Sequence, residues 1–372
     1  MRGKSLVVAA SLLVLGTACA RAGGGAAGGS SAAAGPPGAP AGSAAAGDAG
    51  AQTSPTPPEL RKVRLAYGFV STTDVPMWIA DDQGLWQKYG LDVDATLLQS
   101  SAQIAPAMAA GEIDVALTAG AGVVDIDLAG GDQVLIASLQ NEMRFFVHAQ
   151  PNIRRVEDLR GKQLGITRRG SGINLAADIV LDKAGLEPGS DVALQELGTV
   201  QNEYSALTSG QVAAVILSAP TNILAARQGY PQIADLGDYH VPYSQGALAA
   251  TRATLTERYD LVRDFVKAFV EGLGMAKRDP ALAKRVLSEN TQTTDQDLLD
   301  KSYDLWLGEM DWSLNPSLAA VQTVLDQRAD ERPAAKTAKS QDFVDTRLLD
   351  ELKSSGFLTQ TLGAAPPAAQ TR

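Results

Sequence analysis

Cysteine, histidine and aromatic residues are scarce in this chain of 372 residues. Its single cysteine excludes an internal disulfide framework and a cysteine-cluster metal site. Its two histidines, His148 and His240, leave little material for a zinc site or a histidine-dependent mechanism. The formal net charge of −10 argues against nucleic acid or an anionic membrane surface as the main partner. We therefore expect no metal and no cofactor, and the composition disfavours most enzyme classes.

The first twenty residues have the pattern of an export signal. Arg2 and Lys4 precede an apolar stretch, residues 5–16, which is too short to span a bilayer. Cys19 then resembles the lipidated cysteine of the bacterial lipobox, although Gly16 stands where that pattern usually has Leu. Small residues on both sides of Cys19 also fit the cleavage site of a secreted protein. Both interpretations place the mature protein outside the cytoplasm, and the first adds a lipid anchor in the cell membrane.

Two segments have too few apolar residues to fold. Residues 20–61 are mostly Ala, Gly, Ser, Pro and Thr, and residues 359–372 have a similar composition. Such segments bury too little apolar surface to offset the entropy lost on ordering. We predict a disordered tether, a disordered tail and a folded part from about Lys62 to Leu358.

Strand and helix patterns alternate through the folded part, which predicts α/β architecture with largely parallel sheets and helices on both faces. Short apolar or alternating stretches predict strands at 63–67, 91–97, 113–117, 134–139, 164–167, 192–197 and 212–217. Periodic stretches predict helices at 75–90, 101–111, 173–184, 255–277, 280–289, 295–308 and 316–329.

A weak internal repeat suggests two lobes of the same design. Residues 107–118 align with residues 206–217, which lie 99 positions later in the chain. In each copy a helix ends at a glycine, Gly111 or Gly210, and a short apolar strand follows. The same order of elements is also common in unrelated α/β proteins, so the repeat favours two similar lobes without requiring them.

Five loops leave the carboxyl end of a predicted parallel strand and enter a helix. Open α/β sheets bind ligands at such strand ends, and helix N-termini offer free N–H groups and partial positive charge. Each serine or threonine taken alone also fits an ordinary helix cap. The candidate binding residues in these loops are Ser71, Thr72, Thr73, Ser100, Ser101, Thr118, Ala119, Gly120, Gly170, Ser171, Gly172, Ser218 and Pro220.

Polar and aromatic side chains near these loops are further candidates. Arg168 and Arg169 could pair with an anionic ligand or form a solvated surface pair, and Asp74 could bind an amine or cap its helix. Both histidines fall near the expected lobe crossings, and we interpret them as structural. We find no Walker A loop, dinucleotide fingerprint, nucleophile elbow, paired carboxylates or zinc-protease motif. The additional candidates are Trp78, Gln103, Arg169, Asn174, Gln201, Asn202 and Tyr243.

Five segments of the folded part carry a family pattern, in this order: 76–86, 89–93, 110–116, 158–165 and 185–192. Together they resemble the extracytoplasmic solute-binding proteins of ABC importers. They are most similar to the sulfonate, nitrate, taurine and thiamine-precursor group (SsuA/NMT1/THI5-like). Singly the segments are weak, and in series they indicate this family without specifying a ligand.

The resemblance implies a type II periplasmic-binding-protein fold, in which two α/β lobes are joined by a hinge of two crossovers. Lobe 1 would contain residues 62–148 and 245–358, and lobe 2 residues 149–244. The crossovers would fall near 146–151 and 240–245. A monomeric protein would close around one small molecule, and a membrane permease would recognise the closed form.

The chain departs from the family pattern in two places. In lobe 2, Ala213 stands where the family's Gly-x-Val-Asp-Ala pattern has aspartate, and the cysteine-rich run of the related pyrimidine synthases is missing. The second departure argues against an enzyme. A sensing module without transport and an enzyme on the same fold are the alternatives. Helix N-termini and arginines favour an anionic ligand, whereas Trp78 and Tyr243 would suit a flat heterocycle.

Overall fold

The computed structural model describes residues 59–98 and 100–363. The described residues all fall within one compact unit. The expected export signal, Cys19 and nearly all of the tether lie outside these residues, as does the end of the tail. None of the helices between residues 59 and 363 is both long and apolar enough to cross a membrane.

The first sheet has five strands in the order β2-β1-β3-β10-β4. β1 shows why these segments form strands, because Val63 and Leu65 are buried while Arg64 between them is exposed. β1 is parallel to β2 and β3, whereas β10 is antiparallel to both β3 and β4. The strands are β1 (Arg61–Tyr67), β2 (Leu91–Leu97), β3 (Val115–Thr118), β4 (Gln133–Glu142) and β10 (Pro242–Thr251).

The second sheet repeats this plan in the order β7-β6-β8-β5-β9. β6 is parallel to β7 and β8, and β5 is antiparallel to β8 and β9. The predicted repeat falls on β3 and β8, which hold the third position in their sheets. The strands are β5 (Phe146–Ala149), β6 (Gln163–Ile166), β7 (Ala193–Glu196), β8 (Ala214–Leu217) and β9 (Gln232–Asp235).

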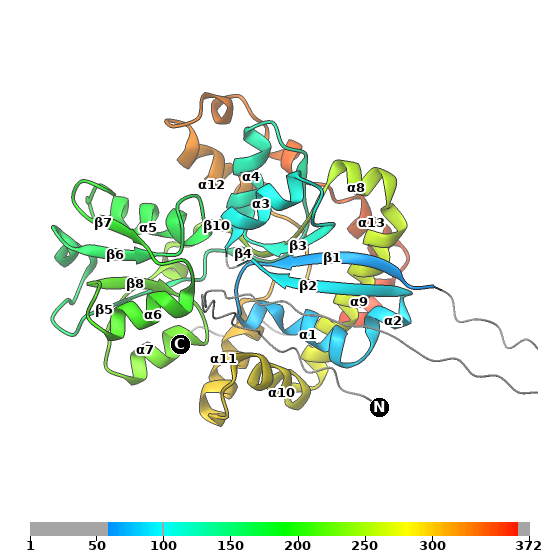
Figure 1. Cartoon of the computed structure of the whole chain (residues 1–372), viewed down its shortest axis with the longest axis horizontal. Helices are drawn as coiled ribbons and strands as arrows, with labels where there is room; N and C mark the ends of the chain where they lie inside the picture. Colours follow the sequence, from blue (N-terminus) through cyan, green and yellow to red (C-terminus); the bar gives the residue numbers. More distant parts are fainter. Residues whose placement is uncertain (1–58, 99, 364–372) are drawn as a thin grey trace, which may run out of the picture. The chain divides into compact units, whose positions relative to one another are not determined.

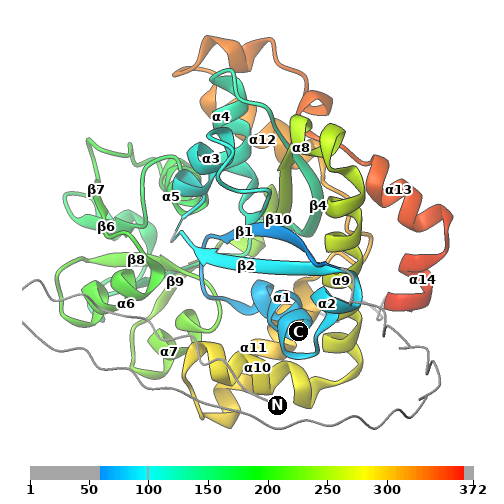
Figure 2. The ribbon, with the colours of Figure 1, turned by 45° about the vertical axis from the view of Figure 1, so that its right-hand side comes forward.

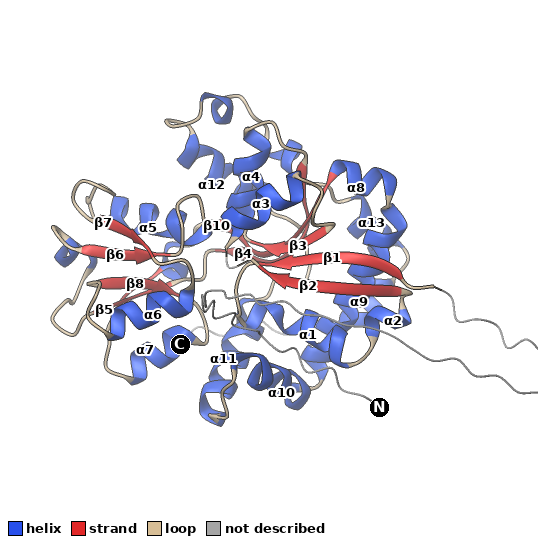
Figure 3. Ribbon diagram, in the orientation of Figure 1, coloured by secondary structure: helices blue, strands red, loops and turns tan. Residues whose placement is uncertain are grey.

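Helices cover both faces of the first sheet (Figures 1, 2 and 3). α3 and α4 lie on one face, and α1, α2 and α9 lie on the other. The α-helices are α1 (Val75–Asp82), α2 (Leu85–Lys88), α3 (Ser101–Ala109), α4 (Gly120–Leu128), α5 (Gly172–Lys183), α6 (Val200–Thr208), α7 (Thr221–Arg227), α8 (Arg252–Glu257), α9 (Tyr259–Arg278), α10 (Pro280–Thr291), α11 (Gln296–Glu309), α12 (Leu318–Arg328), α13 (Arg347–Ser354) and α14 (Phe357–Leu362). The short 3-10 helices are η1 (Thr72–Asp74), η2 (Val156–Leu159), η3 (Leu236–Tyr239), η4 (Pro333–Lys336) and η5 (Ser340–Phe343).

The two-lobed α/β prediction is confirmed. Each sheet is mixed, because the strand that follows a crossover, β10 in the first sheet and β5 in the second, runs antiparallel to its neighbours. The chain leaves the first sheet after Glu142 and returns to it at Pro242. Phe146 already belongs to a strand of the second sheet, so the first crossover falls before residue 146 and not within 146–151. We call the first sheet with its helices lobe 1 and the second sheet with its helices lobe 2.

Three expected boundaries were wrong. The helix predicted at 75–90 is broken at Gly84, whose left-handed φ of 65° ends α1 and starts α2. The helix predicted at 255–277 is interrupted at Arg258, which separates α8 from α9. The folded part also extends past Leu358, because α14 continues to Leu362 and buries that side chain.

An apolar core holds α1, α2 and α9 beneath the first sheet. Trp86 stacks on Phe265 with ring centroids 5.0 Å apart, and both side chains are at most 2% exposed. Burial of such a ring stabilises the fold by about 1.5–3 kcal/mol. A second apolar cluster runs from Ala119 and Val321 of lobe 1 to Ile173 and Val215 of lobe 2. The lobes therefore share apolar contacts in this structure.

Candidate functional site

Three helix N-termini from the two lobes meet around one small cavity. Its lining includes the starts of α3 and α4 from lobe 1 and the start of α5 from lobe 2. The enclosed space measures about 10 Å³, close to the room that one water molecule needs. The two lobes therefore leave little free space between these helix starts in this structure. The lining residues are Phe69, Ser100, Ser101, Ala119, Phe145, Thr167, Ser171, Gly172 and Ile173.

The lobe 1 side of the cavity carries hydrogen-bonding groups that the chain does not use. Ser100 and Ala119 are the N-caps of α3 and α4, and neither helix has a side-chain cap. Among the described residues, no hydrogen-bond partner faces the buried hydroxyls of Ser100 and Ser101, nor that of Thr118, which lies outside the cavity lining. A buried hydroxyl without a partner costs free energy, so these groups favour a polar guest at this place.

The lobe 2 side of the cavity is capped internally. Ser171 accepts a hydrogen bond from the Asn174 backbone N–H at 3.1 Å, as an N-cap does. Its hydroxyl also accepts a hydrogen bond from the Thr167 hydroxyl at 2.9 Å. Gly170, in the left-handed region with φ of 75°, donates its N–H to the Asn174 side-chain oxygen at 3.0 Å. This network holds the start of α5 rigidly against the cavity.

Tyr243 touches the other lobe at a glycine. A Cβ atom added to Gly172 would lie 2.3 Å from the Tyr243 hydroxyl and 3.2 Å from Ala119 Cβ. Only glycine therefore permits this approach of the lobes. Burial raises the pKa of the Tyr243 hydroxyl, and the nearby backbone amide of Ala121 offsets part of that shift. The neutral hydroxyl lies at the lobe boundary, beside two lining residues.

The first predicted loop stabilises its own helix. Ser71 and Asp74 form a capping box, in which Ser71 N–H donates to Asp74 Oδ2 at 2.8 Å. Burial raises the pKa of Asp74 well above its ordinary value. Thr72 and Thr73 are buried next to this cap. Ser71 and Asp74 are therefore helix caps. None of the residues 71–74 lines the cavity.

The remaining candidates lie away from the cavity lining. Trp78 packs in the lobe 1 core. Arg169 is 64% exposed and pairs with Glu196 at 3.8 Å on the lobe 2 surface. Gln201 and Asn202 are exposed on the first turn of α6. Ser218 and Pro220 are partly buried ahead of α7, and Gly120 packs its backbone against Ser244.

Gln103 and Arg168 connect the lobes beside the cavity. With its amide oxygen toward lobe 2, Gln103 accepts hydrogen bonds from Arg168 at 2.9 and 3.2 Å. Charge-assisted hydrogen bonds of this kind are stronger than neutral ones. Of the two adjacent arginines, Arg168 faces the other lobe and Arg169 faces solvent.

Sequence reasoning missed four lining residues, Phe69, Phe145, Thr167 and Ile173. Phe69 follows β1 and Thr167 follows β6, so position after a strand was an available signal for both. Phe145 lies in the first crossover, which was placed too late in the chain. The two phenyl rings make the lining partly apolar, and none of its described side chains is ionisable.

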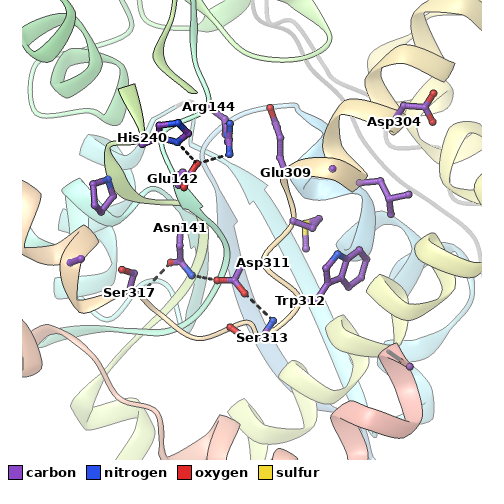
Figure 4. A pocket seen from close by; sticks show the side chains of 16 residues that line it. Asn141, Glu142, Arg144, His240, Asp304, Glu309, Asp311, Trp312, Ser313 and Ser317 are labelled. Atoms are coloured by element: carbon purple, nitrogen blue, oxygen red, sulfur yellow. Dashed lines mark hydrogen bonds and ion pairs between the residues drawn. The ribbon is translucent and has the colours of Figure 1, made fainter. Parts of the chain in front are cut away.

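A larger hollow of about 1020 Å³ lies at the two crossovers (Figure 4). It is lined by Glu142 and Arg144 of the first crossover, by His240 of the second, and by the segment after α11. It contains none of the predicted ligand-binding residues. His240 Nδ1 lies 3.7 Å from Glu142, and the other histidine, His148, is buried in β5 with a pKa lowered by burial. Residues 59–98 and 100–363 contain no cluster of three potential metal ligands.

Comparisons with known proteins agree with this architecture. Residues 71–283 match the family described as NMT1/THI5 like. YtlA of Bacillus subtilis (strain 168), named as a binding protein, is 23% identical over 281 residues, covering 72% of this chain and 84% of YtlA.

Two solved structures share the fold. The alkanesulfonate-binding protein SsuA from Xanthomonas axonopodis pv. citri has a TM-score of 0.65 at 17% identity, over 77% of this chain and 99% of that one. The periplasmic nitrate-binding protein NrtA from Synechocystis PCC 6803 has a TM-score of 0.63 at 16% identity, over 84% of this chain and 93% of that one. With a family match over more than half of its length, this chain belongs to the NMT1/THI5-like family and has the fold of the periplasmic substrate-binding proteins of ABC importers.

Proposed function

We propose that this protein is the extracytoplasmic solute-binding component of an ABC importer. It captures one small molecule between its lobes as a monomer and delivers that molecule to a membrane permease. The observation that carries the proposal is the cavity shared by both lobes, with its uncapped helix N-termini and its unpartnered hydroxyls. A lipid on Cys19 would keep the protein at the membrane, and the protein would catalyse no reaction.

The lining suggests which ligands fit. Backbone N–H groups at the starts of α3 and α4, with the hydroxyls of Ser100 and Ser101, would bind an anionic or carbonyl oxygen. Phe69 and Phe145 would contact a flat or apolar part. The ligand is therefore a small anion or a small heterocycle with a polar edge. The lobes must part to admit it and then close around it less tightly than in this structure, where the cavity has room for little more than a water molecule.

We infer hinge closure because residues from both lobes line the cavity. A ligand shifts an equilibrium between open and closed lobes only if it binds the two forms with different affinity. A ligand that touches Ser100 of lobe 1 and Gly172 of lobe 2 gains contacts only when the lobes close. The permease would then recognise the closed arrangement.

A thermal-shift screen over sulfonates, carboxylates, nitrate and pyrimidines tests ligand binding. A ligand that binds only the native state at about 100 times its Kd stabilises it by about 2.7 kcal/mol, which raises the Tm. We expect a Tm increase in one of these classes. No increase in any class would contradict the proposal, and unchanged uptake of the ligand after deletion of the protein would contradict its role in import.

Gly172→Ala tests closure itself. The new Cβ would overlap the Tyr243 hydroxyl, so we expect the lobes to stay apart and ligand affinity to fall at least tenfold, with little change in the Tm of the free protein. Gly172→Ala combined with Tyr243→Phe is the control, because loss of the hydroxyl removes the 2.3 Å overlap and should restore part of the affinity. Wild-type affinity in Gly172→Ala, measured by calorimetry, would show that the cleft need not close.

A further inference from the structure

The hollow at the two crossovers has no part in the proposed import function. It shares no lining residue with the cavity between the lobes. Its volume of about 1020 Å³ is at the upper end of the range of small-molecule sites. We call it the hinge hollow, because its lining comes mostly from the first crossover, the second crossover and the segment from α11 to α12.

Carboxyl groups dominate the charge of the hinge hollow. Its described lining has one arginine, Arg144, and four acidic residues, Glu142, Asp304, Glu309 and Asp311 (Figure 4). Arg144 Nη2 donates to Glu142 Oε2 at 2.6 Å, so the charges of this pair cancel. Among the residues that the structure describes, no Lys, Arg or His nitrogen lies within 4.0 Å of the Asp304, Glu309 or Asp311 carboxyl oxygens. The hollow therefore attracts positive charge.

Neither an anion nor a metal ion suits this lining. Arg144 and His240 both face Glu142, so an anion would have to compete with a carboxylate for them. No three potential metal ligands lie together in the described part of the chain. Asp304, Glu309 and Asp311 lie at separate places around the hollow (Figure 4). Separated carboxyl groups of this kind match the spaced amino groups of one organic cation.

Apolar side chains complete the lining. Leu307, Met310 and Trp312 lie beside the carboxyl groups. Lys277 Nζ lies 4.4 Å from the centre of a Trp312 ring, so the chain itself already places an ammonium group against this side chain. The methylene chain of a diamine would contact the apolar side chains while its amino groups reach the carboxyl groups.

Glu309 has an oxygen left for such a ligand. Gln140 Nε2 donates to Glu309 Oε2 at 3.0 Å, and none of the described groups donates to Oε1. Burial raises the pKa of Glu309 to about 8, Arg144 lowers it, and Asp235 raises it. The carboxyl group is therefore mostly protonated at pH 7. An ammonium group beside it would favour its ionised form.

We propose that the hinge hollow binds a small organic diamine or polyamine, with Asp304, Glu309 and Asp311 as the partners of its amino groups. The ligand enters as an ammonium ion. The carboxyl group of Glu309 releases its proton to solvent and forms an ion pair with the ligand, and no covalent bond of the ligand changes. Binding does not require a ligand in the cavity between the lobes, because the two sites share no residue.

Calorimetric titration of the full chain with 1,4-diaminobutane tests this site. Titrations at pH 7 in phosphate and in Tris measure proton release, because the two buffers take up a proton with different enthalpies. We expect up to about one proton released for each diamine bound. The uncharged analogue 1,4-butanediol has the same chain length and should not bind.

Three variants separate the site from general attraction to an acidic protein. Glu309→Gln should weaken binding and abolish proton release. Asp304→Asn should weaken binding about threefold or more and keep proton release. Asp300→Asn is the matched control, because Asp300 lies one turn earlier on α11 and pairs with Lys284 outside the hollow. It should bind the diamine as the wild type does.

Two results would overturn the proposal. One is a Kd for the diamine weaker than about 10 mM. The other is binding without proton release that Asp300→Asn and Asp304→Asn weaken equally, because the diamine would then be attracted only by the overall negative charge. Neither result bears on the import function, which the thermal-shift screen tests with ligands of the other cavity.

Discussion

Glu309 is one of four carboxyl groups that line the hinge hollow (Figure 4). Gln140 donates from Nε2 to its Oε2 at 3.0 Å. Burial raises the pKa of Glu309 to about 8, Arg144 lowers it, and Asp235 of lobe 2 raises it. Glu309 therefore holds a proton at neutral pH. The sequence around Glu309 does not indicate this, because the groups that surround its side chain come from distant segments of the chain.

Glu309→Gln should make the protein more stable at pH 8. Between pH 4.5 and pH 8 the folded state binds one proton more than the unfolded state, so stability falls as the pH rises through that window. The glutamine keeps the shape of the side chain and cannot ionise. Because Glu309 is only partly shielded from water, we expect a gain of about 1–3 kcal/mol at pH 8 and little change near pH 4.5.

Urea unfolding at both pH values measures this difference. Glu257→Gln, an exposed glutamate on α8, serves as the control and should change stability little at either pH. A Glu309→Gln variant no more stable than wild type at pH 8 would mean that Glu309 ionises at its ordinary pKa in the folded protein.

At the residue scale, the sequence showed which residue types could bind a ligand better than it showed which way their side chains point. Ser100 and Ser101 line the cavity, as a loop at a strand end suggests, whereas Ser71 turns inward to cap its helix. Arg168 reaches the other lobe, and its neighbour Arg169 pairs with Glu196. Side-chain direction depends on packing against segments far away in the sequence, so residue type and spacing could not separate these cases.

At the scale of elements, the contact of α1 with α9 depends on one glycine. A Cβ atom at Gly272 of α9 would lie 2.3 Å from the Pro76 carbonyl oxygen of α1. The α9 residues Phe265 and Phe269 are buried on the face that meets α1 and α2. The backbones therefore approach closely, and the large rings fill the space beside the contact.

Gly272→Ala should destabilise the fold by about 1–3 kcal/mol, because the methyl group must push α1 away from α9. Urea unfolding measures the loss. Gly68→Ala provides a matched control for stability, since the same substitution there finds ordinary contact distances. Equal unfolding midpoints for the two variants would mean that α1 can move away at no cost.

Element positions were largely predictable, because their signals are local. Apolar periodicity identified β1, β3 and β8 and the long helices, and glycine marked the ends of α3 and α6. The crossover strand β5 and the last helices, α13 and α14, were missed. β5 falls in the segment that was expected to cross between the lobes, and α14 is stabilised by burial of Leu358 and Leu362 in the lobe 1 core rather than by local composition.

At the scale of the whole molecule, charges join the lobes on the side of α7 and α11. Arg227 of lobe 2 pairs with both Asp295 and Asp297, at the start of α11 in lobe 1. These carboxylates are largely exposed, so salt screens their attraction to Arg227. In the proposed hinge motion this contact is lost when the lobes open, so it would favour closure more at low ionic strength.

Arg227→Gln should lower the closed population in dilute salt. The difference from wild type should shrink in about 1 M salt, where the Debye length falls to about 3 Å and exposed ion pairs are weakened. Spin-label distances between the lobes measure both populations. Lys284→Gln is the control, because Lys284 pairs with Asp300 within lobe 1, at 2.7 Å. A salt response in Arg227→Gln equal to that of wild type would show that this ion pair does not contribute to closure.

The sequence by itself determined two lobes of similar α/β design and helix starts that follow parallel strands. These properties follow from apolar periodicity, from the positions of glycines and from the repeated order of helix and strand. Each of these signals can be read from a short stretch of sequence. Only the tertiary structure decided which helix starts meet. It brought α3, α4 and α5 to one cavity with Phe69 and Phe145, left Gln201 and Asn202 of α6 exposed, and set Tyr243 against Gly172. The physical reason is that the approach of two lobes depends on the summed packing of the whole chain.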